Sequence, residues 1–135
     1  MKKNRFVYLI LPVITLILEL LPYGAVLNFG YQKEDGTIGT LRKTCSYFSL
    51  TPFGYANFAP LFTAITTCII LAVLLLFCIT GREKLAVTAR NLLCVGVVLS
   101  LGPLAFGLRF YSVVGALISL TMAAELFLLY RSLQK

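Results

Sequence analysis

The chain has 135 residues, of which 59% are hydrophobic and 13% are charged, and its formal net charge is +7. Soluble proteins carry roughly 25% charged residues, so this chain has too few to cover a soluble surface, which excludes a soluble enzyme and a disordered tail. It contains no His, which also excludes an imidazole base and a His-ligated metal site. The composition is typical of an integral membrane protein.

Four apolar stretches predict the fold class, an all-α, antiparallel four-helix transmembrane bundle that forms a single domain over residues 1–135. About 20 apolar residues span a bilayer as a helix, and a helix satisfies its own backbone hydrogen bonds in lipid. The expected spans are Phe6–Phe29, Ala59–Ile79, Asn91–Leu108 and Phe110–Tyr130. One long loop, about residues 30–58, would separate the first two spans.

The distribution of basic residues predicts the orientation, because Lys and Arg are enriched in cytoplasmic loops. Both tails and the connection after the second span contain Lys2, Lys3, Arg5, Arg82, Lys84, Arg90, Arg131 and Lys135, whereas the other side has Lys33, Arg42, Lys43 and Arg109. We therefore expect a multi-pass protein of the cell membrane with both termini in the cytoplasm and the long loop outside. The positive charge then reflects anionic membrane lipids as partners and not nucleic acid.

The start of the chain also resembles a signal peptide that would be cut after Ala25. Tyr23 is large for a position that prefers small residues, and Glu19 and Pro22 interrupt the apolar run. For these reasons we favour a first span over a cleaved leader.

The last part of the long loop is dense in aromatic residues, with Tyr47, Phe48, Phe53, Tyr55 and Phe58. One interpretation is an interfacial segment at the outer headgroups, in which Tyr and Phe replace the absent Trp. The other is a lid over the bundle or an outer docking surface for a second protein. In both cases we expect residues 47–58 to be ordered on the outer surface of the bundle.

The four cysteines show no CxxC spacing, so neither a redox site nor a zinc site is expected. Cys45 is the only one outside the expected spans and their ends, and a disulfide there would need a second exposed cysteine. We therefore expect four free thiols, with Cys68, Cys78 and Cys94 as packing residues. An intermolecular bond through Cys45 is the alternative.

Glu19 is the most informative polar residue, because an ionisable group at membrane depth is a functional hypothesis by default. Thr15 and Tyr23 lie one turn on either side and should share its face. One hypothesis is an outward-facing polar cavity that binds a small ligand, with the candidate residues Thr15, Glu19, Tyr23, Thr63, Thr66, Thr67, Ser100, Arg109, Ser112 and Ser119. The alternative is that these groups join helices and that Glu19 is structural, either paired with Arg109 or protonated. Both hypotheses require Glu19 to point into the bundle.

The last span carries a stripe of small residues that should pack against the other helices, formed by Ser112, Ala116, Ser119 and Ala123. Glu125 projects away from this stripe and need not face the bundle. Since it lies near the inner boundary, we expect it to reach the interface or to pair with Arg90. A contact with a partner subunit is the alternative.

The four-span plan, and above all the stretch Ser46–Tyr55 that leads into the second span, resembles uncharacterised small four-span membrane proteins of Gram-positive bacteria. This resemblance covers most of the chain, implies a bacterial cell-membrane protein and brings no function with it. Small multidrug resistance transporters also have four short spans and a glutamate in the first, which Glu19 would match, but the long loop and the lack of Trp depart from them. Claudin-like proteins share the long first loop, but their tryptophan and paired cysteines are missing, since only Cys45 is available.

Two function classes follow from these features. The first is a non-enzymatic accessory or interaction protein that binds a partner membrane protein or a second copy of itself, without cofactor or metal. The second is a small transporter or ligand-binding bundle around Glu19. An intramembrane enzyme is the weakest reading, because no His and no paired acids at one depth frame a catalytic site.

Overall fold

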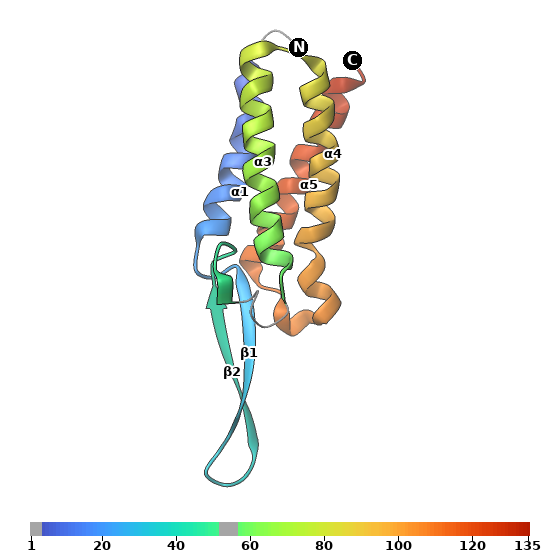
Figure 1. Ribbon diagram of the computed structural model, residues 1–135. Helices are drawn as coiled ribbons and strands as arrows, with labels where there is room; N and C mark the ends of the chain where they lie inside the picture. Colours follow the sequence, from blue (N-terminus) through green and yellow to red (C-terminus); the bar gives the residue numbers. More distant parts are fainter. Residues whose placement is uncertain (1–3, 52–56) are drawn as a thin grey trace.

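The computed structural model describes residues 4–51 and 57–135, in which a helical bundle carries a long hairpin at one end (Figure 1). In chain order the elements are η1 (Arg5–Leu9), α1 (Ile10–Leu20), β1 (Ala25–Gln32), β2 (Ile38–Cys45), α3 (Ala59–Thr80), α4 (Glu83–Ser100), η2 (Gly102–Phe106), η3 (Leu108–Phe110) and α5 (Val113–Leu133). Helix α1 packs against α3 and α5, and α4 packs against the same two helices. The bundle helices therefore form a closed ring.

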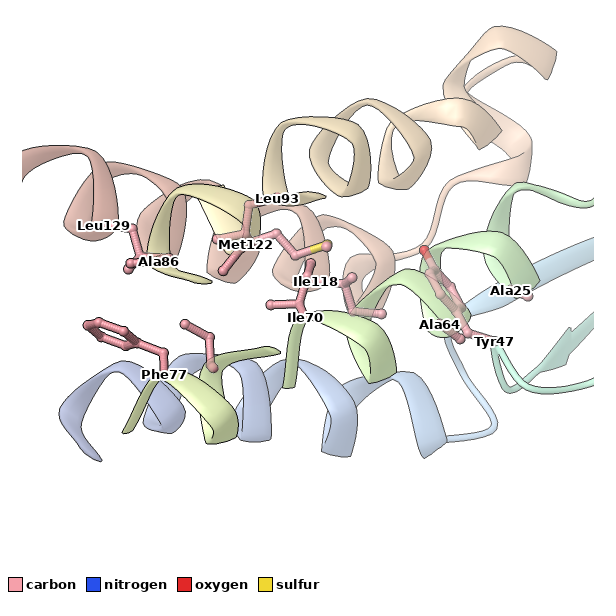
Figure 2. Close-up of a cluster of buried hydrophobic side chains, with 12 residues drawn as sticks. Ala25, Tyr47, Ala64, Ile70, Phe77, Ala86, Leu93, Ile118, Met122 and Leu129 are labelled. Atoms are coloured by element: carbon pink, nitrogen blue, oxygen red, sulfur yellow. The ribbon is translucent and has the colours of Figure 1, made fainter. Parts of the chain in front are cut away.

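Each bundle helix contains a series of buried residues at alternating intervals of three and four, the spacing of helices that pack at a shallow angle. The series are Pro12, Thr15 and Glu19 on α1; Thr63, Thr67, Ile70, Leu74 and Phe77 on α3; Ala86, Ala89, Leu93, Gly96 and Ser100 on α4; and Gly115, Ile118, Met122, Glu125 and Leu129 on α5. Further buried residues, such as Ala64 and Thr66 on α3 and Ser119 on α5, flank these series. Figure 2 shows Phe77, Ala86 and Leu129 at one end of the core and Tyr47 and Ala25 at the other.

A glycine of α4 faces a methionine of α5. A Cβ atom at Gly96 would collide with the end of the Met122 side chain. The Met122 side chain therefore occupies the space that the glycine leaves between the two helices, and small residues are common where membrane helices pack.

Among the described residues, α3, α5 and the continuous helical stretch Glu83–Phe106 are each long and apolar enough to cross a membrane. Helices α3 and α5 coincide with two of the expected spans to within three residues at each end. Helix α4 begins eight residues before the expected third span. Its first turns carry the exposed Glu83 and Lys84, which extend the helix beyond the apolar stretch from which the span was predicted.

The first expected span, Phe6–Phe29, is wrong in its second half. Helix α1 ends at Leu20, and Leu21 already has extended backbone angles of φ −64° and ψ 139°. Pro22 follows directly, and a proline forces the residue before it out of the helical region. Because residues from Ala25 onward form a strand, the all-α prediction is also wrong: the helical fold carries a small two-stranded sheet.

Strands β1 and β2 form an antiparallel hairpin with registered pairs from Ala25↔Cys45 to Gln32↔Ile38. Its turn is closed by Asp35, whose carboxylate accepts hydrogen bonds from the Thr37 hydroxyl at 2.6 Å and from the Thr37 amide at 3.0 Å. These bonds hold the pKa of Asp35 below its usual value, and Gly36 supplies the left-handed residue of the turn with φ 83°.

The hairpin is buried at its base and exposed at its tip. Ala25, Val26 and Leu27 are buried where β1 leaves the bundle, whereas Ile38 is 83% exposed. The Tyr31 ring lies over Gly39 on the facing strand, where a Cβ atom would come within 2.7 Å of it. The hairpin thus extends the molecule well beyond the helix ends (Figure 1).

Candidate functional site

Glu19 lies at the end of α1 and turns into the bundle, where it is 0% exposed. Its Oε1 atom accepts a hydrogen bond of 2.7 Å from the Thr67 hydroxyl of α3, and its Oε2 atom has no hydrogen-bond partner among the described residues. The same residue also joins the helix to the loop, because its backbone oxygen accepts a bond of 3.0 Å from the Tyr47 amide. Glu19 therefore ties α1 both to α3 and to the segment that follows the hairpin.

One turn earlier on α1, Thr15 makes the matching contact with α5. Its hydroxyl lies 2.7 Å from that of Thr121, and the two residues are buried and half-buried respectively. Thr121 was not among the residues selected from the sequence. Its depth in the last span, close to that of Thr15 in the first, was the signal that could have identified it.

Glu125 is also inside the bundle, at 2% exposure, and no residue in the described part of the chain forms a hydrogen bond with its Oε1 atom. The expectation that it reaches the interface or pairs with Arg90 is wrong. The face of α5 that is buried runs through Ile118, Met122 and Leu129, and Glu125 occupies a position of that series. Large apolar side chains, and not the stripe of small residues, decide which face of α5 turns inward.

The two buried acids lie on opposite sides of the threonine pair. Glu19 follows Thr15 by four residues on α1 and Glu125 follows Thr121 by four residues on α5, about 6 Å along each helix. Because α1 and α5 run in opposite directions, Glu19 lies toward the hairpin and Glu125 toward the other end of the bundle. Acids and hydroxyl groups thus follow one another along the seam between α1 and α5.

The remaining hydroxyl residues of the predicted cavity are buried but mostly bond to their own helices. Thr63, Thr66 and Ser100 each donate to a backbone oxygen within their own helix, at 2.7 to 2.8 Å. Ser119 lies 2.8 Å from the Tyr111 hydroxyl, which precedes α5. These bonds satisfy groups that would otherwise be unpaired in the core.

Ser112 has a more specific position, directly before α5. Its hydroxyl accepts a bond of 2.9 Å from the Gly115 amide, which caps the helix, and donates one of 2.6 Å to the Gly24 backbone oxygen. It therefore joins the start of α5 to the turn between α1 and β1.

Two members of the predicted cavity lie elsewhere. Tyr23 follows the end of α1 and is 60% exposed, so it does not share the buried face of Thr15 and Glu19. Arg109 is exposed in η3, and the carboxyl of Glu19 receives no hydrogen bond from it. Pairing of Glu19 with Arg109, one of the two structural alternatives, is therefore wrong, because Glu19 is buried against Thr67 of α3 whereas Arg109 is at the surface.

The aromatic residues proposed as an outer docking surface are separated in the same way. Tyr47 is 1% exposed and belongs to the core, so it cannot be part of an outer surface. Phe48 is half-buried and Phe58 is exposed, while Phe53 and Tyr55 lie outside the described residues. Tyr47 instead closes the end of the bundle, with its ring against Gly24, where a Cβ atom would approach the ring to 2.8 Å.

All four cysteines are free thiols, as expected. The expected packing role fits only Cys78, which is buried with its sulfur 3.3 Å from the Arg5 backbone oxygen. It is wrong for Cys68 and Cys94, which are exposed on the outside of the bundle. In the described part of the chain, no three His, Cys, Asp or Glu side chains come together as a metal site would require.

Comparison of the chain with protein-family models, with curated proteins and with solved structures finds no match.

Proposed function

We propose that the chain is a small, non-enzymatic, four-span protein of a bacterial cell membrane, and that it works as an accessory or interaction module. Its termini would lie in the cytoplasm and its hairpin outside. The remaining span, which comes first in the chain, would be η1 with α1. Their five 3₁₀ residues and eleven helical residues extend about 26 Å, close to the bilayer core of about 30 Å. Exposed Ile10, Ile14 and Ile17 on α1 support its contact with lipid.

The observation that carries the interaction role is the hairpin. In the part of the chain that the structure describes, the sheet has only these two strands, and Tyr31, Leu41 and Ile38 expose apolar side chains on a segment that projects away from the helices. Isolated two-stranded hairpins are marginally stable, and an unpaired edge is a template for another strand. A partner protein that covers the hairpin would stabilise it and would prevent its strand edges from pairing with other chains.

Photo-crosslinking in the native membrane tests this role. A photoreactive phenylalanine analogue in place of Ile38 should yield a discrete protein adduct, while the same analogue in place of Val98, which is exposed on α4, should not. Absence of a protein adduct at Ile38, or the same adduct at both positions, would contradict a role for the hairpin in binding a partner protein.

A second candidate is a small transporter or ligand-binding bundle with Glu19 as its coupling group. The observation that favours it is the pair of acids, each with an unpartnered oxygen, on either side of the Thr15–Thr121 contact. Against it, Glu19 is wholly shielded from solvent, so the bundle would have to open for a ligand to reach it. A proton flux in liposomes that Glu19→Gln abolishes would favour this candidate over the first.

A further inference from the structure

A cavity of about 220 Å³ lies beneath the hairpin, away from the Glu19 contact. Among the described residues its walls are Leu27, Asn28 and Phe29 of β1, Asn57 before α3, Phe106 of η2 and Phe110 of η3. The rings of Phe106 and Phe110 meet edge to face, with their centroids 6.3 Å apart. Phe106 is 54% exposed, so this wall extends to the surface of the molecule.

Asn57 is the unusual member of this lining. It is only 5% exposed, yet within residues 4–51 and 57–135 neither the oxygen nor the nitrogen of its carboxamide has a hydrogen-bond partner. The large majority of buried polar side-chain atoms are hydrogen-bonded, and one left unpaired needs an explanation. Here a donor and an acceptor are both unpaired on one planar group that lines a cavity.

The surrounding backbone holds the walls in place. Gly102 packs so closely on α3 that a Cβ atom there would come within 2.7 Å of the Ala59 Cβ, which fixes η2 beside Asn57. Gly107, with φ 114°, makes the turn that brings Phe110 back toward Phe106. The side-chain amide nitrogen of Asn28 donates a bond of 3.2 Å to the Arg109 backbone oxygen, which joins β1 to η3.

We propose that this cavity binds a small uncharged ligand whose primary amide, or an equivalent donor–acceptor edge, pairs with the carboxamide of Asn57. An amide offers one acceptor and one donor side by side, so it can satisfy both atoms of Asn57 at once. A carboxylate offers acceptors only and would leave the Asn57 oxygen unpaired. The phenylalanine walls suit a flat apolar body next to that edge.

The cavity volume limits the size of the ligand. Pockets for drug-sized molecules measure roughly 300–1,000 Å³, so about 220 Å³ accommodates a single ring with its amide but nothing much larger. Benzamide has this shape and is a suitable probe. Methyl benzoate has nearly the same shape but no N–H donor, so it isolates the contribution of the paired edge.

The experiment measures binding of benzamide to the full chain in lipid nanodiscs by ligand-observed NMR. Benzamide should bind at least about tenfold more tightly than methyl benzoate, the effect of one additional hydrogen bond in a buried site. Asn57→Leu should abolish this preference. Asn91→Leu, an exposed asparagine on α4, should leave it unchanged and controls for partition into the lipid.

A stability measurement on the same variants excludes misfolding as the cause. Because Asn57→Leu replaces an unpaired buried amide with an apolar group of similar size, the thermal midpoint should stay the same or rise. Absence of a preference for benzamide in the unaltered chain would overturn the proposal, since the Asn57 carboxamide would then not pair with the amide of a ligand. A thermal midpoint several degrees lower in Asn57→Leu would overturn it too, because the amide would then already have a partner within the protein.

Discussion

At the scale of single residues, the inward orientation of Glu19 could be predicted because an ionisable side chain that faces lipid costs free energy. The side chain is therefore expected to face the interior of the bundle. Its partner could be predicted only as one of several hydroxyl residues, since Thr67 is singled out by how α1 crosses α3. The position of Glu125 could not be predicted from the small-residue stripe. Its orientation depends on Ile118, Met122 and Leu129, whose bulk fills the space between the helices.

The bond between Thr67 and Glu19 should stabilise the bundle measurably. Thr67→Val removes the one hydrogen bond that a described residue donates to the Glu19 carboxyl and should lower the free energy of unfolding in detergent by about 1–2 kcal/mol. Thr63→Val is the matched control, because the hydroxyl of this equally buried residue donates only to its own helix, and its effect should be clearly smaller.

A double-mutant cycle separates this bond from the loss of packing. In a Glu19→Leu background the effect of Thr67→Val should largely disappear, because the carboxyl that it would leave unpaired is gone. An effect of the same size in both backgrounds would show that the stability does not come from this contact.

At the scale of elements, hydrophobic runs located α3 and α5 well because these helices are apolar over their whole length. The same criterion failed at the end of the first run, where Pro22 stops α1 and the chain changes from helix to strand. Residues 27–32 alternate apolar and polar or small side chains, which is the period of a strand. That signal lies inside and just beyond an apolar run long enough to span a membrane, so the hydrophobicity of the run conceals the strand.

The start of α5 depends on Ser112, which both caps the helix and holds the turn after α1. Ser112→Ala removes both bonds and should lower the free energy of unfolding by about 1–2 kcal/mol, measured by denaturation in detergent. Ser132→Ala is the control at the other end of the same helix, where the hydroxyl donates only to the Leu129 backbone oxygen. Equal effects of the two substitutions would mean that Ser112 does not join the elements.

At the scale of the whole molecule, the bundle has an apolar outer surface and a core with polar groups at several depths. Exposed Ile65, Ile69, Val95, Val98 and Leu120 cover α3, α4 and α5, where a soluble bundle would carry charges. Such a surface is stable only against lipid or another protein. Three of the described helical stretches are long and apolar enough to span a membrane by themselves, and α1, the shortest bundle helix, is not one of them. The four-span arrangement therefore requires that α1 crosses the membrane together with η1.

Site-directed thiol labelling tests this arrangement most directly. The chain would carry single cysteines at Asn4→Cys, directly before η1, or at Ile38→Cys in the hairpin, in a background with Cys45, Cys68, Cys78 and Cys94 replaced by Ser. In intact cells a membrane-impermeant maleimide should label Ile38→Cys and should label Asn4→Cys only after permeabilisation, because α1 separates the two positions across the bilayer. Equal labelling of both in intact cells would place them on the same side and contradict the four-span arrangement.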